Sequence, residues 1–240
     1  MTILAFDSSN EQLSIALLRD DGAVASYLGE GGAKASETIL PMINALLNDE
    51  KLTLKDLSGI AFGAGPGAFT GVRVACGVAQ GLGFGANIPV VGVNTLHAMA
   101  ESFSQAHGGH AKVIVCIDAR LSELYFAALE KVDGVWLEIS PTALYKPDNL
   151  PTTDGENWAG VGNGWQVSGD QLQAKYANQM SNTYPSFMPE AISIARLAAP
   201  ILASGDADLM LRYSASLATP LYVRNRVALT EAERALGQRL

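Results

Sequence analysis

One glycine-rich run constrains this 240-residue chain more than any other feature. Residues 63–77 read GAGPGAFTGVRVACG and follow Gly59–Phe62, an apolar stretch typical of a buried strand. Three of the glycines permit backbone angles that other residues avoid, and Pro66 fixes one angle among them. The pattern predicts a strand, a stiff loop and a helix that begins near Thr70. Unpaired N–H groups at that helix end suit an anion or the tightly docked backbone of a partner.

The helix itself carries glycines at every fourth residue, Gly77, Gly81 and Gly85. They share one helix face, and each costs roughly 1 kcal/mol of helix propensity relative to alanine. This row indicates close backbone approach, either to the chain's own sheet or to a helix of a partner. A nucleotide-triphosphatase loop is not expected, because the required Gly-Lys-Ser/Thr is absent and Arg73 falls inside the helix.

The charge and the cysteine content narrow the range of functions expected for the chain. The formal net charge is −8, from 16 Lys+Arg against 24 Asp+Glu, so the chain is not expected to bind tRNA without a partner. The only local basic cluster, which we interpret as a solvated C-terminal tail, contains Arg224, Arg226, Arg234 and Arg239. Cys76 and Cys116 lack metal-ligand spacing and predict reduced core residues of a cytoplasmic protein. We expect no metal site, no signal peptide and no membrane span.

Two segments repeat one another. Ile3–Asp7 and Val113–Asp118 are apolar strands that end in aspartate, and each leads through a short turn into a second strand. Asp21-Gly22 and Asp133-Gly134 then give hairpin signals before a third strand. The second and third strands are expected at 13–18 and 23–28 in the first copy and at 123–130 and 135–139 in the second.

The remaining pattern alternates strands with helices, which favours a mixed α/β sheet in each of two lobes. Further strands are expected at 57–62, 89–93 and 158–161, and helices at 36–48, 70–86, 96–105 and 189–203. Asn94 is placed to cap the helix at 96–105. We predict an N-terminal lobe over residues 1–106 and a C-terminal lobe over residues 107–240.

The glycine-rich run resembles the signature of the TsaB family, also called YeaZ. The residues that carry the signature are Gly65, Pro66, Gly67, Phe69, Thr70, Gly71 and Arg73. The resemblance extends to 3–8, 39–42, 117–120, 123–125, 161–165 and 220–225, and so covers most of the chain. It implies the duplicated two-lobe fold of actin, sugar kinases and chaperone ATPases, which is ribonuclease H-like, and the internal repeat independently supports that fold.

The resemblance also implies a role. A TsaB-like chain is a non-catalytic scaffold that pairs with TsaD, while TsaE hydrolyses ATP, in threonylcarbamoyl transfer to the adenosine beside the tRNA anticodon. The chain lacks the His-x-x-x-His metal pair of TsaD, so we expect no enzyme and no tightly bound cofactor, with ATP or ADP at most within the complex. The alternatives are a small ATPase or kinase, or a peptidase, of the same fold.

Two sets of site residues follow from the resemblance. The positions that match a vestigial nucleotide cleft are Asp7, Ser8, Asp118, Gly162 and Gly164. Ala119 and Arg120 depart from the expected turn there, and both aspartates also fit a purely structural role in their turns.

The partner surface is expected on the two helices of the first lobe, where it binds TsaD or, when TsaD is absent, a second copy. Its residues are Ile39, Met42, Ile43, Leu46, Val74, Val78 and Leu82. Core packing is the alternative for the first helix, which we expect to kink or to begin at Pro41.

Overall fold

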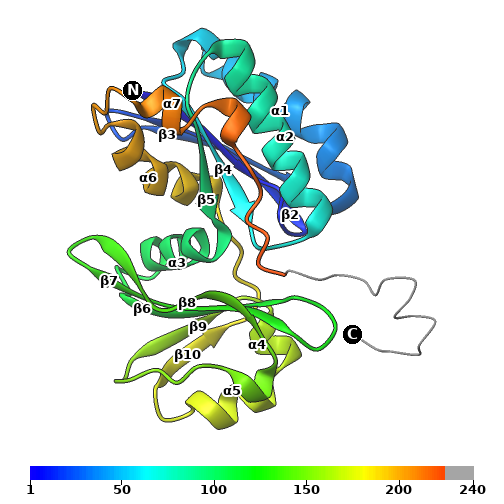
Figure 1. The fold of residues 1–240 in the computed structure, drawn as a ribbon, viewed down its shortest axis with the longest axis vertical. Helices are drawn as coiled ribbons and strands as arrows, with labels where there is room; N and C mark the ends of the chain where they lie inside the picture. Colours follow the sequence, from blue (N-terminus) through cyan, green and yellow to red (C-terminus); the bar gives the residue numbers. More distant parts are fainter. Residues whose placement is uncertain (225–240) are drawn as a thin grey trace.

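Figure 1 shows the computed structural model, which describes residues 1–224, as two α/β lobes stacked along the long axis. Arg226, Arg234 and Arg239 of the predicted basic tail lie outside the described residues. Among the described residues, none of the helices is long and apolar enough to cross a membrane.

Each lobe is built on a five-stranded sheet with the same topology. The first sheet has the order β3-β2-β1-β4-β5, in which β1 pairs antiparallel with β2 and parallel with β4. The second has the order β8-β7-β6-β9-β10, in which β6 takes the place of β1. The strands are β1 Thr2–Asp7, β2 Gln12–Arg19, β3 Val24–Glu30, β4 Gly59–Gly65, β5 Val90–Asn94, β6 Lys112–Asp118, β7 Leu124–Val132, β8 Val135–Tyr145, β9 Trp158–Val161 and β10 Met180–Tyr184. The predicted repeat is confirmed, and with it the duplicated actin-like fold.

Two helices, α1 (Ala35–Asp49) and α2 (Phe69–Ala86), cover one face of the first sheet. Strand β1 turns Leu4 and Phe6 toward these helices and Ile3 and Ala5 toward the other face, as its period of two requires. Helix α1 begins at Ala35 and continues through Pro41, so the predicted start at Pro41 is wrong. Pro41 is exposed, where water can satisfy a backbone group that the proline leaves unpaired.

Helices α3 (Thr95–Ala106) and α6 (Ala191–Leu202) lie between the sheets, and each packs on the sheet of the other half of the sequence. Leu96, Met99 and Phe103 of α3 share a core with Val113 and Val115 of β6. The apolar residues of α6 share a core with strands β1, β2, β4 and β5; they include Ala191, Ile194, Ala195 and Ala198.

The sequence therefore misplaces the lobe boundary. The predicted ranges 1–106 and 107–240 assign α3 to the first lobe and α6 to the second, whereas their cores are exchanged. An apolar helix face does not indicate which sheet it will cover, which is why the sequence pattern could not assign these helices.

The far face of the second sheet is covered by two short helices, α4 (Gly164–Val167) and α5 (Gly169–Tyr176). Trp165 and Tyr176 pack there against Cys116 and Ile114 of β6. Cys76 and Cys116 are both buried and unbonded to each other, as expected for core cysteines. After α6 the chain passes through α7 (Leu209–Arg212) and returns toward the gap between the lobes.

Candidate functional site

The signature loop packs backbone to backbone on the turn that follows β1. Ala68 N–H donates to the backbone oxygen of Ser9 at 2.7 Å. A Cβ added at Gly67 would lie 2.6 Å from that oxygen, and one added at Gly63 would lie 1.7 Å from Asp7 Oδ2. The backbone that docks on the loop is therefore the chain's own turn after β1, which the sequence analysis did not predict.

Asp7 lies under this loop and is fully buried. Its Oδ1 accepts hydrogen bonds from Ser9 N–H at 2.9 Å, Ser9 Oγ at 2.8 Å and Asn10 Nδ2 at 3.1 Å. Burial raises the pKa of Asp7 to about 6, and the two bonds from Ser9 oppose that rise. Ser8 is also buried, and its hydroxyl donates to the backbone oxygen of Gly71 at 2.8 Å. These contacts support the structural interpretation of Asp7, because its hydrogen bonds stay within its own turn.

The turn after β6 is different, because it is open to solvent. Asp118 accepts the N–H of Arg120 at 2.8 Å and pairs with its guanidinium at 3.2 Å. Arg120, Leu121 and Ser122 have φ values of 64°, 56° and 56°. A left-handed conformation costs a residue with a side chain roughly 1–2 kcal/mol, so the surrounding contacts must hold this turn in place.

The two glycines expected at an adenosine position serve close packing on β6. Gly162 has a φ of 98°, and a Cβ there would lie 2.4 Å from the backbone oxygen of Cys116. A Cβ at Gly164 would lie 2.7 Å from the Cβ of Cys116. Between them, Asn163 is exposed and its Oδ1 accepts the N–H of Asp118 at 2.9 Å.

A cleft of about 1110 Å³ lies between the lobes, and its walls come from both. Of the five residues predicted for the nucleotide cleft, only Asp118 lines it. Its lining also includes Phe69, Arg73, Ala119, Tyr222 and Arg224. A cleft of this size could hold a drug-sized ligand, but the buried Asp7 is not available to it. Within residues 1–224 no group of three or more His, Cys, Asp or Glu side chains is placed to hold a metal.

The predicted partner residues of α1 divide into two groups. Ile39, Ile43 and Leu46 are buried in the core of the first lobe, so they cannot meet a partner. Met42 is half-buried and lies beside Gly29 of β3. The stripe is the inward face of an amphipathic helix, and the core-packing alternative is the correct one for these three residues. The exposed face of α1 carries Leu40 instead, which is 50% exposed.

Helix α2 has a half-buried apolar row and an open glycine row. Its predicted partner residues Val74, Val78 and Leu82 are half-buried against the core of the first lobe. A Cβ added at Gly77, Gly81 or Gly85 would meet no atom within 4 Å, so this row does not pack on the chain's own sheet. The same face carries Phe84, which is 83% exposed and which the sequence analysis missed. Its position, three residues after Gly81, could have revealed it, because that spacing returns to the same helix face.

Together, the duplicated sheets, the two helices exchanged between them and the cleft between the lobes define a class, the two-lobe proteins of actin-like fold. In this member the aspartate that ends β1 is buried beneath the glycine-rich loop. Comparison with known proteins narrows the class. A family model described as TsaD, tRNA N6-adenosine threonylcarbamoyltransferase, matches residues 32–231. The chain belongs to the TsaB family, also called YeaZ, within that wider group.

The relatives resemble the chain over nearly its whole length. The tRNA threonylcarbamoyladenosine biosynthesis protein TsaB of Escherichia coli is 34% identical, over 95% of this chain and 96% of its own length. The protein of the same name from Haemophilus influenzae is 32% identical, over 95% of this chain and 95% of its own length. YeaZ from Pseudomonas aeruginosa has a TM-score of 0.78 at 33% identity, covering 92% of this chain and 100% of its own. A component of a 2-hydroxyglutaryl-CoA dehydratase from Acidaminococcus fermentans, 10% identical with a TM-score of 0.50, shares the fold alone.

Proposed function

We propose that this chain is a non-catalytic subunit of tRNA threonylcarbamoyladenosine biosynthesis, which works by binding a TsaD-type subunit through helix α2. The names of the TsaB relatives supply the pathway. The observation that carries the proposal is the open glycine row of α2.

This row has an energetic cost that no contact within residues 1–224 offsets. Gly77, Gly81 and Gly85 together lose about 3 kcal/mol of helix propensity relative to alanine. Nothing among the described residues packs against them in return. A partner helix laid along the row could approach the α2 backbone closely, and Phe84 at its end would supply the aromatic anchor that interfaces favour. The same stripe would serve a homodimer when the TsaD-type partner is absent.

The burial of the Asp7 side chain supports a non-catalytic role. A phosphate-transfer site of this fold needs its first aspartate at the cleft, and here that side chain is buried and hydrogen-bonded within its own turn. We therefore propose no tightly bound cofactor, with ATP or ADP engaged only in the assembled complex and hydrolysed by TsaE. Transfer of the threonylcarbamoyl group would take place on TsaD.

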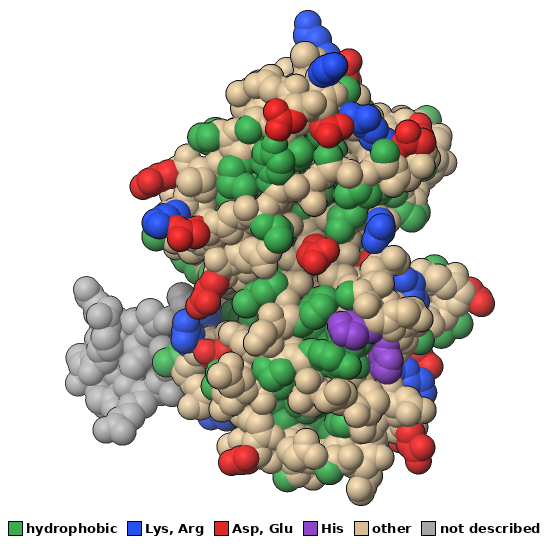
Figure 2. Space-filling view, turned by 180° about the vertical axis from the view of Figure 1, so that it is seen from behind, with side chains coloured by type: hydrophobic (Ala, Val, Ile, Leu, Met, Phe, Trp, Pro, Cys, Tyr) green, Lys and Arg blue, Asp and Glu red, His purple; other side chains and the backbone are tan. Residues whose placement is uncertain are grey.

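Contact with tRNA would also come through the complex, in the cytoplasm. On the face shown in Figure 2, the Lys and Arg side chains of the described residues are dispersed among Asp and Glu side chains over both lobes. Affinity for nucleic acid depends on clustered cations, and the net charge of −8 opposes it. We expect no retention of tRNA by the isolated chain at physiological salt in a gel-shift experiment.

The deciding experiment is reconstitution with TsaD, TsaE, tRNA, ATP and the threonylcarbamoyl donor, omitting one protein at a time. Transfer should require this chain and TsaD together, and the isolated chain should neither hydrolyse ATP nor cleave a peptide substrate. Multiple turnovers by the isolated chain would favour the ATPase, kinase or peptidase alternative.

A matched pair of variants tests the surface. Gly81→Arg should fold, fail to co-purify with TsaD and give no transfer. Gly169→Arg, at an equally open glycine of the second lobe, should behave as the parent does. Retained binding by Gly81→Arg would remove α2 from the interface.

A further inference from the structure

The last described segment of the chain crosses the cleft between the lobes. We refer to residues 218–224 as the C-terminal strap. It starts on the first lobe, where the backbone oxygen of Ala218 accepts hydrogen bonds from Gln80 Nε2 at 2.8 Å and Cys76 Sγ at 3.4 Å. Leu221 N–H then donates to the backbone oxygen of Ala64 at 2.7 Å, at the end of β4. These contacts fix the strap on α2 and on the first sheet.

The middle of the strap contacts the first turn of α2. Tyr222 OH accepts a hydrogen bond from Arg73 Nε at 2.8 Å, and its ring lies 6.0 Å from that of Phe69. The guanidinium of Arg73 lies 3.8 Å from the centre of the Phe69 ring, a cation–π arrangement. The strap therefore rests on two residues of the signature, Phe69 and Arg73.

The strap ends on the second lobe. Arg224 donates to the backbone oxygen of Ala119 at 2.8 Å and pairs with Glu123 Oε2 at 2.6 Å. Its side chain is only 12% exposed, and that of Glu123 is 22% exposed. Hydrogen bonds between charged groups are stronger than neutral ones, and partial burial protects this pair from screening by salt. Both acceptors belong to the turn that contains the three left-handed residues.

We infer that the C-terminal strap is an interlobe latch, which sets the opening of the cleft through the contact of Arg224 with Glu123 and Ala119. One end is fixed on the first lobe by backbone hydrogen bonds, and the other grips a turn of the second lobe. Breaking the Arg224 end leaves the lobes joined through α3 and α6 but removes the restraint across the cleft. The contacts of Arg224 with Ala119 and Glu123 also offset the backbone strain of residues 120–122. This turn should therefore rearrange when those contacts break.

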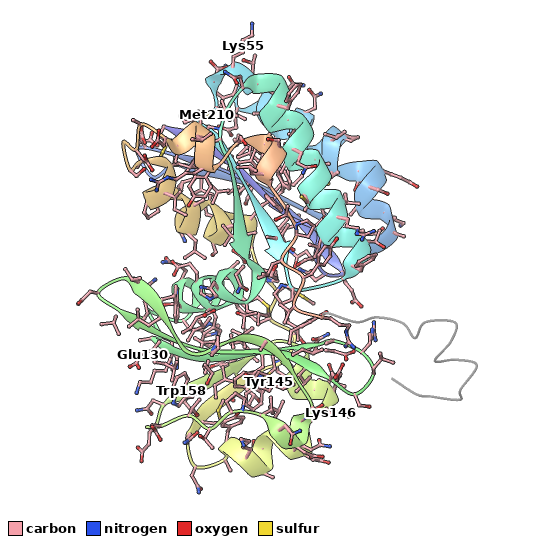
Figure 3. The ribbon with its side chains drawn as sticks, in the orientation of Figure 1. Lys55, Glu130, Tyr145, Lys146, Trp158 and Met210 are labelled. Carbon is pink, nitrogen blue, oxygen red and sulfur yellow. The ribbon has the colours of Figure 1, made fainter. Side chains whose placement is uncertain are left out.

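The test measures the separation of the lobes by electron-spin distance measurements. Spin labels are attached at Lys55→Cys in the first lobe and Lys146→Cys in the second, two exposed positions labelled in Figure 3. The native cysteines are buried, and the parent without introduced cysteines controls for their labelling. Arg224→Ala and Glu123→Ala should each shift or broaden the distance distribution beyond the width of the parent's. The matched control is Arg212→Ala, since the ion pair of Arg212 with Asp206 does not reach the second lobe.

A charge swap makes the test specific to the contact. Arg224→Glu combined with Glu123→Arg restores an ion pair and should move the distribution back toward that of the parent. Native circular dichroism is required of every variant, and Arg224→Met, which keeps a long unbranched side chain but has no donor, replaces Arg224→Ala if that variant does not fold. An unchanged distribution in folded Arg224→Ala or Arg224→Met protein overturns the inference, and so does an equal shift in Arg212→Ala.

Discussion

A Cβ atom on Gly71 would stand 1.8 Å from the backbone oxygen of Ser8. The first turn of α2 and the turn after β1 are in direct backbone contact at this point, and the hydroxyl of Ser8 closes the contact from the other side. A side chain at position 71 would therefore clash with the backbone of Ser8. The glycine of the signature at this position is needed for the chain to fold.

Gly71→Ala should lower the free energy of unfolding by about 1–3 kcal/mol, because backbone atoms cannot move aside as a flexible side chain can. Gly77→Ala, in the same helix, should raise it by about 0.5–1 kcal/mol, because the added methyl group meets no atom and improves helix propensity. Urea denaturation followed by circular dichroism measures both. Equal effects of the two substitutions would contradict the docked-loop arrangement.

Substitutions at Leu46 of α1 and Phe84 of α2 should have opposite effects, because Leu46 is buried and Phe84 is exposed. Leu46 is 1% exposed, so Leu46→Asp would bury a charge without a partner and should abolish the cooperative melt. Phe84→Asp should leave the melting temperature of the isolated chain nearly unchanged and should prevent co-purification with the TsaD-type partner. A folded Leu46→Asp protein would show that α1 does not bury this face.

Asp7 makes stability depend on pH in a direction that is unusual for a carboxylate. Its pKa rises from an ordinary value of 3.8 to about 6 on folding. The folded chain therefore binds the proton more tightly, and the stabilisation is present below the ordinary value and is lost as pH rises through about 6. The difference corresponds to about 3 kcal/mol. Asp7→Asn has no proton to lose, so parent and variant should diverge across this interval in unfolding free energy; parallel curves would show that Asp7 is not buried.

Glu101 of α3 ties that helix to the second sheet, as it accepts hydrogen bonds from Lys131 at 2.6 Å and Trp136 at 2.8 Å. Glu101→Gln leaves Lys131 half-buried without its partner and should cost about 3–5 kcal/mol in thermal denaturation. Lys34→Ala removes an exposed pair with Glu30 and should cost less than about 1 kcal/mol.

The pH dependence of the unfolding free energy provides a second test of the role of Glu101. Burial raises its pKa, but hydrogen bonds from Lys131, Trp136 and Gln105 together bring it below the ordinary value of 4.5. Its stabilisation is therefore present above that value and is lost as pH falls through the lower folded value. The advantage of the parent over Glu101→Gln should shrink on acidification, which is the opposite trend to that of Asp7.

The sequence predicted those parts of the fold whose causes are local. Strands ending at Asp7 and Asp118 were found because apolar runs followed by hairpin signals are short-range patterns. The cap of α3 was found for the same reason, and Asn94 Oδ1 does accept the N–H of Leu96 at 2.9 Å. Helices α4 and α5 were missed, because they are short and α5 turns only two residues, Leu172 and Tyr176, to the core.

The candidate partner surface was predicted only in part, because an apolar stripe in the sequence does not indicate whether it packs on the chain's own sheet or on a partner. Ile39, Ile43 and Leu46 form such a stripe and cover their own sheet, whereas the glycine row of α2 is open. Distinguishing them requires knowing which helix face meets the sheet. The strap was not predicted either, since the contact between Arg224 and Glu123 joins residues that are distant in sequence.

The exchange of α3 and α6 has a consequence for the order in which the protein can be made. When residues 1–106 have left the ribosome, the complete first sheet is present, but the helix that covers one of its faces has not been synthesised. That face stays apolar and uncovered until residue 202 has emerged, while α3 waits for strands that come after it. The first lobe therefore cannot mature before the second, whose elements from α3 to β10 are contiguous in sequence. A fragment cut between α3 and β6 would keep an unburied face on the first sheet.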